Sequence, residues 1–249
     1  MTITGEEDLA RLKAVGHVCA LARDAMAIAM RPGITTAELD EIGARVLAAH
    51  GARSAPQLEY DFPGATCISV NEEIAHGIPG DRVITAGDLV NIDVSAELDG
   101  VFADTGASYV VPAASPELLA LCRDGKRAMW EGIRAVRSGA GLRDIGMAIG
   151  AFARKHRYTL IENLASHGVG DTLHDEPGEI STWPDRSERR VITDGLVFTI
   201  EPFLSLGGTA AAERGDDPWT LVAQPSALCV QYEHTVVATR KGAIVVTLN

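Results

Sequence analysis

One long internal repeat limits the folds available to this chain. Residues Arg82–Asp93 align without gaps with Arg190–Glu201, 108 residues later, and both segments begin Arg-Val-Ile-Thr. Six of the twelve aligned positions are identical, and Asp93 aligns with Glu201. Proteins built from stacked repeats have much shorter periods, of about 20–50 residues. The repeat therefore predicts two similar halves that pack together.

A second pair of segments extends the repeat and brings in two histidines. His76-Gly-Ile-Pro-Gly-Asp81 matches His174-Asp-Glu-Pro-Gly-Glu179 at an offset of 98, so the second copy carries about ten extra residues near 180–189. We expect residues 1–249 to form a single domain, with its repeat halves at about 1–111 and 112–249. Equivalent acids and equivalent histidines should then meet where the halves join.

Local patterns place helices before strands in each half. Helix-start signals and apolar periodicity predict four helices, at about Thr4–Met30, Thr35–Val46, Ser115–Val136 and Leu142–His156. Apolar runs predict strands at 65–70, 89–97, 101–111, 191–203, 228–237 and 242–248. This order favours an α+β fold, with a curved antiparallel sheet and helices on its outer face.

Two aspartates are predicted to lie close together on one face of a hairpin. Asp99-Gly100 is a strong two-residue turn signal. With that turn, Asp93 pairs with Gly106 and Asp104 pairs with Ser95. The two aspartates are then diagonal neighbours on one face, about 7–8 Å apart, where they could share cations. A shift of one residue in the register would place them on opposite faces.

Other acids also lie in apolar strand segments. Asp93 lies within Asn91–Val94, Glu201 ends the run Val197–Ile200, and Glu233 lies within Val230–Val237. A single strand aspartate is usually solvated, but several buried carboxylates require cations or hydrogen-bond donors. With the imidazole of His167 this set is hard and oxygen-rich. It suits two divalent ions such as Mn, Fe, Co or Zn, rather than a thiolate zinc site or a calcium loop.

Charge and hydropathy exclude several partners. The 22 Lys and Arg against 34 Asp and Glu give a net charge of −12, which argues against nucleic acid and anionic membranes. No apolar run approaches the roughly 18–20 residues of a membrane helix. Residues Met1–Asp8 are acidic where a signal peptide would be basic. We expect a cytoplasmic protein with four free cysteines and no disulfide framework.

The motifs as a set resemble those of type I methionine aminopeptidases. The resemblance covers nearly the whole chain and implies the pita-bread fold, with two pseudo-symmetric halves. The residues that carry it are Cys67–Asn71, His76–Pro79, Asn91–Val94, Asp104-Thr105, His167–Gly170, His174–Pro177, Thr199–Pro202 and Gln231–Thr235.

The resemblance implies a site for two metal ions. Asp93 would chelate one ion, Asp104 and Glu233 would bridge both, and His167 and Glu201 would bind the other. Such a pair of ions activates a water for attack on the peptide bond.

The resemblance also implies roles toward the substrate. Glu201 would shuttle the proton of the attacking water, His174 would donate to the substrate carbonyl oxygen, and His76 would contact the scissile amide nitrogen. The substrates would be peptide or nascent-protein N-termini with a small second residue, and the enzyme would be a monomer. The methionine pocket would be lined by Cys67, Phe62 and Trp219.

The sequence differs from the family in one part of this pocket. Pro56-Gln-Leu-Glu-Tyr60 replaces a segment that carries Cys and Tyr, and Glu59 stands near a pocket tyrosine position. The complete ligand set therefore predicts hydrolysis, whereas methionine selectivity depends on this pocket. The alternatives are an Xaa-Pro aminopeptidase-like or altered-specificity enzyme on the same fold, and a non-catalytic pita-bread binding protein. The complete ligand set and the acidic charge weigh against the last.

Overall fold

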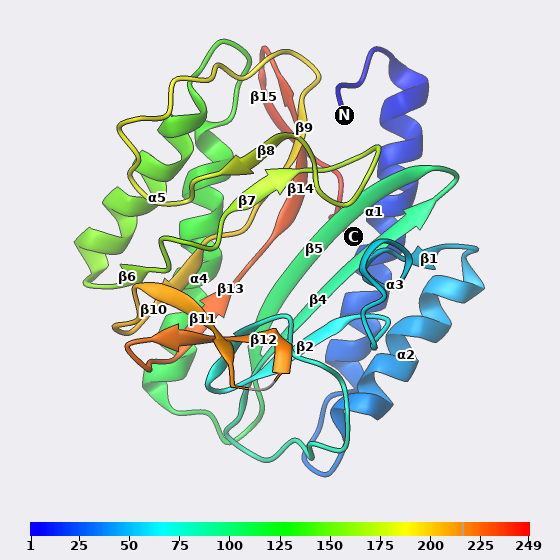
Figure 1. Cartoon of the computed structure of the whole chain (residues 1–249), viewed down its shortest axis with the longest axis vertical. Helices are drawn as coiled ribbons and strands as arrows, with labels where there is room; N and C mark the ends of the chain where they lie inside the picture. Colours follow the sequence, from blue (N-terminus) through cyan, green and yellow to red (C-terminus); the bar gives the residue numbers. More distant parts are fainter. Residues whose placement is uncertain (216) are drawn as a thin grey trace.

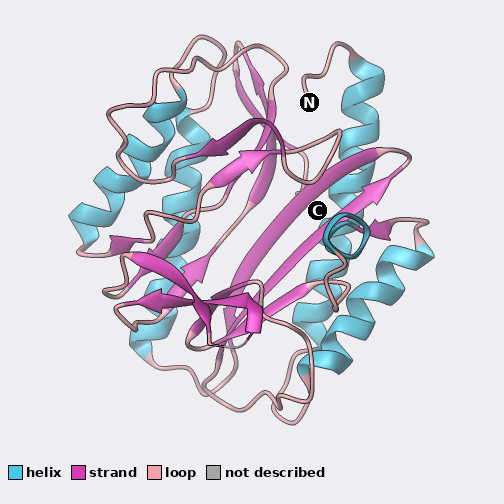
Figure 2. Cartoon of the chain, viewed as in Figure 1, coloured by secondary structure: helices cyan, strands magenta, loops and turns pink. Residues whose placement is uncertain are grey.

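The structure is a computed structural model that describes residues 1–215 and 217–249. Helices flank the strands on two sides, and Figure 2 shows this separation of helix from strand. The helices are α1 (Glu6–Ala29), α2 (Thr36–Ala49), α3 (Ala55–Tyr60), α4 (Pro116–Ala135) and α5 (Leu142–His156). The four long helices confirm the predicted ones, whereas the short α3 was not predicted.

The strands form antiparallel sheets in both halves. In the first half they are β1 (Arg53–Ser54), β2 (Cys67–Val70), β3 (Glu73–Ala75), β4 (Leu89–Leu98) and β5 (Val101–Val110). In the second half they are β6 (Thr159–Leu160), β7 (Ser166–Gly168), β8 (Asp175–Ile180), β9 (Val197–Ile200), β10 (Phe203–Ser205), β11 (Ala210–Arg214), β12 (Asp217–Gln224), β13 (Cys229–Gln231), β14 (His234–Thr239) and β15 (Gly242–Val245).

The helix N-termini follow the predicted capping patterns with one exception. The Thr35 hydroxyl accepts from the backbone N–H of Glu38 and the Glu38 carboxylate accepts from the Thr35 N–H, a reciprocal capping box for α2. Ser115 caps α4 through its hydroxyl, with Pro116 in the first turn. The pattern Thr4-x-x-Glu7 predicts such a box at the start of α1 as well, and this prediction is wrong. There the N–H and hydroxyl of Thr4 both donate to Asp8, and the helix begins after Gly5.

The repeat appears in space as matching backbone contacts in the two halves. The amide of Gly33 donates to Ile84, and at the equivalent place the amide of Gly139 donates to Ile192. The isolated bridge between Thr35 and Val83 has its counterpart between Gly141 and Val191. The segments that align in sequence therefore occupy equivalent positions in the fold, as two pseudo-symmetric halves require.

The two halves join at the middle of the molecule. In Figure 1, α1 and α2 lie on one side of the strands and α4 and α5 on the other, with β4, β5 and β14 between them. The amide of Glu233 donates to the carbonyl of Gly106. The Thr235 hydroxyl accepts from the amide of Asp104 and donates to its carbonyl. Strand β5 is thus bonded to the segment of β13 and β14.

The predicted hairpin register is confirmed. Strands β4 and β5 pair Leu98 with Val101, so that Asp93 faces Gly106 and Asp104 faces Ser95. Asp99 and Gly100 have φ of 52° and 79°, the left-handed conformations that a tight hairpin turn needs. Asp93 and Asp104 therefore share one face of the sheet.

Two predicted strands are each interrupted at an acid. The predicted strand 191–203 contains only β9 and the start of β10, and Glu201-Pro202 separates them, because proline has no N–H for a ladder. The predicted strand 228–237 is divided between β13 and β14 at Tyr232-Glu233. Glu201 and Glu233 therefore lie at breaks in the sheet, where their side chains can turn toward the centre.

Each helix pair covers its own apolar core. One cluster of buried side chains joins α1 and α2 to β4 and β5, and includes Leu12, Met26 and Ile92. A second joins α4 and α5 to β9 and β14, and includes Met129, Ile145 and Phe198. Among the helices of residues 1–215 and 217–249, none combines the length and apolar character that crossing a membrane requires.

Candidate metal centre

Acidic side chains from both halves converge at the join. Asp104 comes from β5, His167 from β7 and Glu233 from the break between β13 and β14. One ligand atom from each of these three residues lies within 4.8 Å of the others. Nε2 of His167 is also 3.4 Å from Glu201 and 3.8 Å from Asp104. The carboxylates therefore come from strand segments far apart in the sequence.

Gln231 connects the remaining aspartate to this cluster. Its Nε2 donates to Oδ2 of Asp93 at 3.3 Å and to Oε2 of Glu233 at 3.0 Å. Its Oε1 accepts from the Asn91 amide at 2.8 Å, which fixes the orientation of the Gln231 amide. The five predicted ligands thus lie in one site. Gln231 was not assigned a role from the sequence, although it stands two residues before Glu233 in the same motif.

Hydrogen bonds also orient His167 and Glu201. The Thr199 hydroxyl donates to Oε1 of Glu201 at 2.8 Å and accepts from the backbone N–H of His167. Nδ1 of His167 lies 2.9 Å from the carbonyl of Gly168. With a proton on Nδ1 donated to that carbonyl, Nε2 keeps its lone pair and faces the acids, as a metal-binding imidazole requires.

Burial and mutual repulsion shift the pKa values of these groups. Burial raises the pKa of Asp93 to about 6. Burial, and then the charge of neighbouring acids, raises the pKa of Asp104 and Glu233 well above their ordinary values. The pKa of Glu201 is raised for the same reasons. Such a cluster is costly when ionised unless positive charge lies within it.

The cluster fits a divalent ion in its donor chemistry and in its unsatisfied atoms. Within the described residues, Oδ1 of Asp104 and Oε1 of Glu233 are buried without a hydrogen-bond partner. Both belong to the three-residue group whose ligand atoms lie together. Buried oxygens without donors are what a cation would satisfy, and carboxylates with one imidazole are typical ligands of Mn, Fe, Co and Zn.

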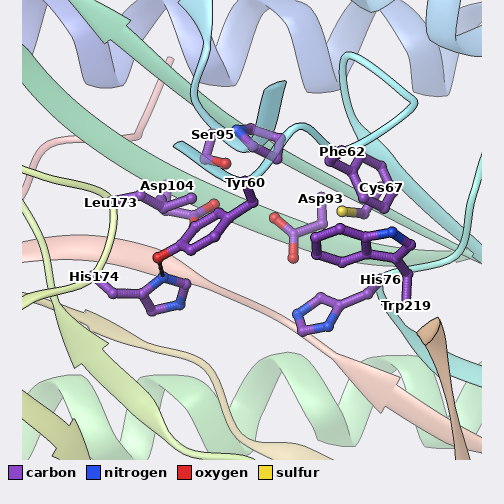
Figure 3. Close-up of a pocket in the computed structure, with 11 residues that line it drawn as sticks. Tyr60, Phe62, Cys67, His76, Asp93, Ser95, Asp104, Leu173, His174 and Trp219 are labelled. Carbon is purple, nitrogen blue, oxygen red and sulfur yellow. Dashed lines mark hydrogen bonds between the residues drawn. The ribbon is translucent and has the colours of Figure 1, made fainter. Parts of the chain in front are cut away.

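A pocket of about 150 Å³ opens beside the acids. Figure 3 shows Asp93 and Asp104 on one side of it, with His76 and His174 nearby. The rings of Phe62 and Trp219 meet edge to face at 5.3 Å. Cys67 stands opposite Asp93 on neighbouring strands. All the residues predicted for substrate contact therefore line this pocket: Phe62, Cys67, His76, His174 and Trp219.

The pocket wall differs from the sequence prediction at one position. Pro56 and Tyr60 line the pocket, whereas Glu59 does not. The Glu59 carboxylate instead accepts from the backbone N–H of Leu173 at 3.0 Å. Adjacent residues on a helix point in different directions, so Glu59 turns toward Leu173 while Tyr60 faces the pocket. Tyr60, rather than Glu59, therefore contributes a polar group to this part of the pocket wall.

Comparison with known proteins places this site in a family. The profile of metallopeptidase family M24 matches residues 10–240. The chain belongs to metallopeptidase family M24. The match includes both halves, all five acidic and imidazole groups of the site, and the histidines of the pocket. An enzyme of family M24 depends on metal, in agreement with the donor set described above.

Several methionine aminopeptidases match the full length of the chain. A methionine aminopeptidase of Staphylococcus epidermidis is 43% identical over 248 residues, which is 99% of this chain and 98% of that protein. Methionine aminopeptidase 2 of Bacillus subtilis is 41% identical, with 99% of each chain covered.

Solved structures show the same fold. The methionine aminopeptidase of Rickettsia prowazekii superposes with a TM-score of 0.94, at 34% identity and with all of both chains covered. A prolidase of Pyrococcus furiosus has a TM-score of 0.79 at 22% identity, and this chain spans 66% of it. That likeness shows a shared fold alone. The predicted pita-bread fold is confirmed.

Proposed function

We propose that this protein removes the N-terminal methionine from peptides and nascent proteins whose second residue is small. The observation that carries the proposal is the position of the acid cluster beside a small pocket. Asp93 and Asp104 belong both to the cluster and to the pocket wall. A side chain held in the pocket therefore has its own amine and its first peptide bond beside the metal ligands.

Five residues would hold a pair of divalent ions. We assign Asp93 to one ion, Asp104 and Glu233 to both, and His167 and Glu201 to the other. When bound, the ions supply Lewis acidity and lower the pKa of water, so that hydroxide is available near neutral pH. The family supports metal dependence. The number of ions and their identity belong to the proposal.

The remaining chemistry falls to side chains of the chain itself. Glu201, oriented by Thr199, would accept the proton of the attacking water and pass it to the leaving amine. His174 would donate a hydrogen bond to the carbonyl oxygen as negative charge develops on it. His76 would hydrogen-bond near the scissile nitrogen. Both histidines are exposed at the pocket, where the substrate backbone would pass.

The pocket wall supports methionine as the first residue. Phe62 and Trp219 supply aromatic edges and faces, and Cys67 adds a polarisable sulfur. A thioether side chain is flexible and packs favourably against aromatic rings. The volume of about 150 Å³ suits a single side chain of this kind. The proposal extends to a cytoplasmic monomer in which residues 1–249 form one domain.

A peptide panel tests this proposal. The metal-stripped protein is assayed for release of the first residue of Met-Ala-Ser, Met-Lys-Ser, Leu-Ala-Ser and Ala-Pro-Ser, with Mn or Co added back. We expect metal-dependent cleavage of Met-Ala-Ser alone. Cleavage of Leu-Ala-Ser or Ala-Pro-Ser instead would contradict the methionine assignment while keeping the hydrolytic site. No cleavage of any peptide would contradict the enzymatic function.

A further inference from the structure

The last turn of α3 contacts the turn that carries His174 at two consecutive residues. Glu59 Oε2 accepts from the backbone N–H of Leu173 at 3.0 Å, and the Tyr60 hydroxyl lies 2.6 Å from Nδ1 of His174. The Tyr60 and His174 rings meet edge to face at 5.5 Å. Figure 3 shows the phenol reaching across the pocket to the imidazole.

The backbone beside His174 is also fixed. The Thr172 hydroxyl donates to the carbonyl of His174 at 2.9 Å, within the same turn. With Glu59 bound to Leu173, the main chain is held on both sides of the imidazole-bearing residue. The ring itself is held by Tyr60, through one of its two nitrogens. The other nitrogen, Nε2, has no hydrogen-bond partner among residues 1–215 and 217–249.

The chemistry of the pair determines which partner donates. A phenol carries one proton, and a neutral imidazole has one donor and one acceptor nitrogen. Partial burial, and then the adjacent charge of Glu59, raises the pKa of Tyr60, so the phenol keeps its proton. A phenol beside a carboxylate is disposed to donate rather than to ionise. Among residues 1–215 and 217–249 the Tyr60 hydroxyl has no hydrogen-bond partner other than Nδ1 of His174, so we assign the phenol proton to that bond. Nδ1 is then the acceptor, and the ring proton lies on Nε2.

We propose that Tyr60 is a positioning residue that fixes His174 in the tautomer protonated on Nε2, with that N–H free to donate to the substrate carbonyl oxygen. This inference rests on the proposed function, in which His174 stabilises the developing oxyanion. Without the phenol, the proton is shared between the two nitrogens and part of the population offers a lone pair to the oxyanion. A donor that is present before the reaction lowers the barrier more than one that must first reorganise.

The tautomer is measured first, on the metal-free protein. ¹⁵N spectra distinguish protonated from unprotonated ring nitrogens, and His174→Gln identifies the His174 signals among the seven histidines. At a pH of about 8, above the ordinary imidazole pKa, we expect the wild-type protein to show Nε2–H alone. Tyr60→Phe should show both tautomers. Protonation on Nδ1 in the wild type, or an unchanged pattern in Tyr60→Phe, would overturn the inference.

A matched control removes a phenol hydroxyl elsewhere. Tyr158 donates to Asp124 at 3.1 Å, in the outer layer of α4 and α5. Tyr158→Phe should leave the His174 pattern as in the wild type. A change in both variants would indicate a general loosening of the fold and would contradict a specific role for Tyr60.

Steady-state kinetics on Met-Ala-Ser then separate positioning from binding. Tyr60→Phe keeps the aromatic ring, so we expect KM within about twofold of the wild type and kcat lowered at least about tenfold. A similar fall in kcat/KM that comes from a higher KM alone, with kcat unchanged, would assign Tyr60 to the pocket wall and overturn the inference. If the wild type cleaves no peptide, the proposed function fails, while the tautomer measurement still decides the Tyr60–His174 contact.

Discussion

At the scale of single residues, the site brings together four carboxylates whose burial makes them costly to ionise. A cation would offset the negative charge of each carboxylate. Within the described residues, Oδ1 of Asp104 is buried without a hydrogen-bond partner. We expect Asp104→Asn to lower metal affinity and activity by more than about a hundredfold, because loss of a ligand exceeds the usual effect of losing a supporting residue. Calorimetric titration with Mn or Co measures the first effect, and cleavage of Met-Ala-Ser measures the second.

The control for Asp104→Asn lies in the same hairpin. Asp99→Asn makes the same chemical change at an exposed turn residue, and asparagine tolerates the positive φ found there. Asp99→Asn should bind metal and turn over as the wild type does. Full activity in Asp104→Asn would remove Asp104 from the ligand set.

The raised pKa of Asp93 predicts how pH acts on the metal-free protein. Its folded pKa of about 6 exceeds the ordinary value, so its contribution to stability is complete below about pH 4 and is lost as pH rises through 6. The variant Asp93→Asn does not ionise at this position, so it does not lose this stability as pH rises. In chelator, the unfolding free energy of the variant relative to wild type should therefore rise by about 1–3 kcal/mol between pH 4 and 7. Urea unfolding measures it.

Added metal should reverse this trend. A divalent ion compensates the carboxylate charges, so the wild type should gain stability with Mn at pH 7 while Asp93→Asn gains less. A relative stability of Asp93→Asn that falls with rising pH would contradict the raised pKa.

At the scale of elements, the close approach of β5 to β13 positions the acids of the site. Gly106 faces Asp93 across the hairpin, and a Cβ on Gly106 would overlap the side-chain amide of Gln231. Gln231 donates to both Asp93 and Glu233. We expect Gly106→Ala to lower metal affinity about tenfold and stability by about 1–3 kcal/mol. Metal titration and urea unfolding measure these effects.

A second glycine provides the comparison for Gly106→Ala. A Cβ on Gly80 would meet no atom of the described residues within 4 Å, and the φ of Gly80 lies outside the left-handed region. Gly80→Ala should therefore change neither metal affinity nor stability appreciably. Equal metal affinity in Gly106→Ala and the wild type would show that the Gln231 contacts do not position the acids.

At the scale of the whole molecule, neither half contains a complete site. Asp93 and Asp104 lie in residues 1–111, whereas His167, Glu201 and Glu233 lie in residues 112–249. Separation would also expose β5, which is bonded to Glu233 and Thr235. We expect each half alone to show no cooperative unfolding and no stoichiometric metal binding. Circular dichroism and calorimetry measure these properties.

Mixing the two halves gives the complementary result. Refolded together, they should recover at least part of the metal binding of the intact chain, because the join is formed by hydrogen bonds and buried side chains rather than by the peptide link alone. Cooperative unfolding of either half by itself would contradict the single-domain proposal.

Much of this arrangement follows from the sequence because its causes are local or repeated. The Asp99-Gly100 turn determines the register of β4 and β5, and period-two alternation then places Asp93 and Asp104 on one face. The aligned segments around Asp93 and Glu201 predicted two equivalent halves, since similar sequences form similar elements. The chemical type of the site also follows, because carboxylates in apolar strands require compensation.

Only the tertiary structure decided how distant segments meet. The position of Gln231 between Asp93 and Glu233, the break at Glu233, and the place of Tyr60 rather than Glu59 in the pocket wall all depend on contacts between parts of the chain far apart in sequence. No turn signal or periodicity encodes such contacts. They result from side-chain packing and hydrogen bonding across the join, and these directions are set only when both halves are in place.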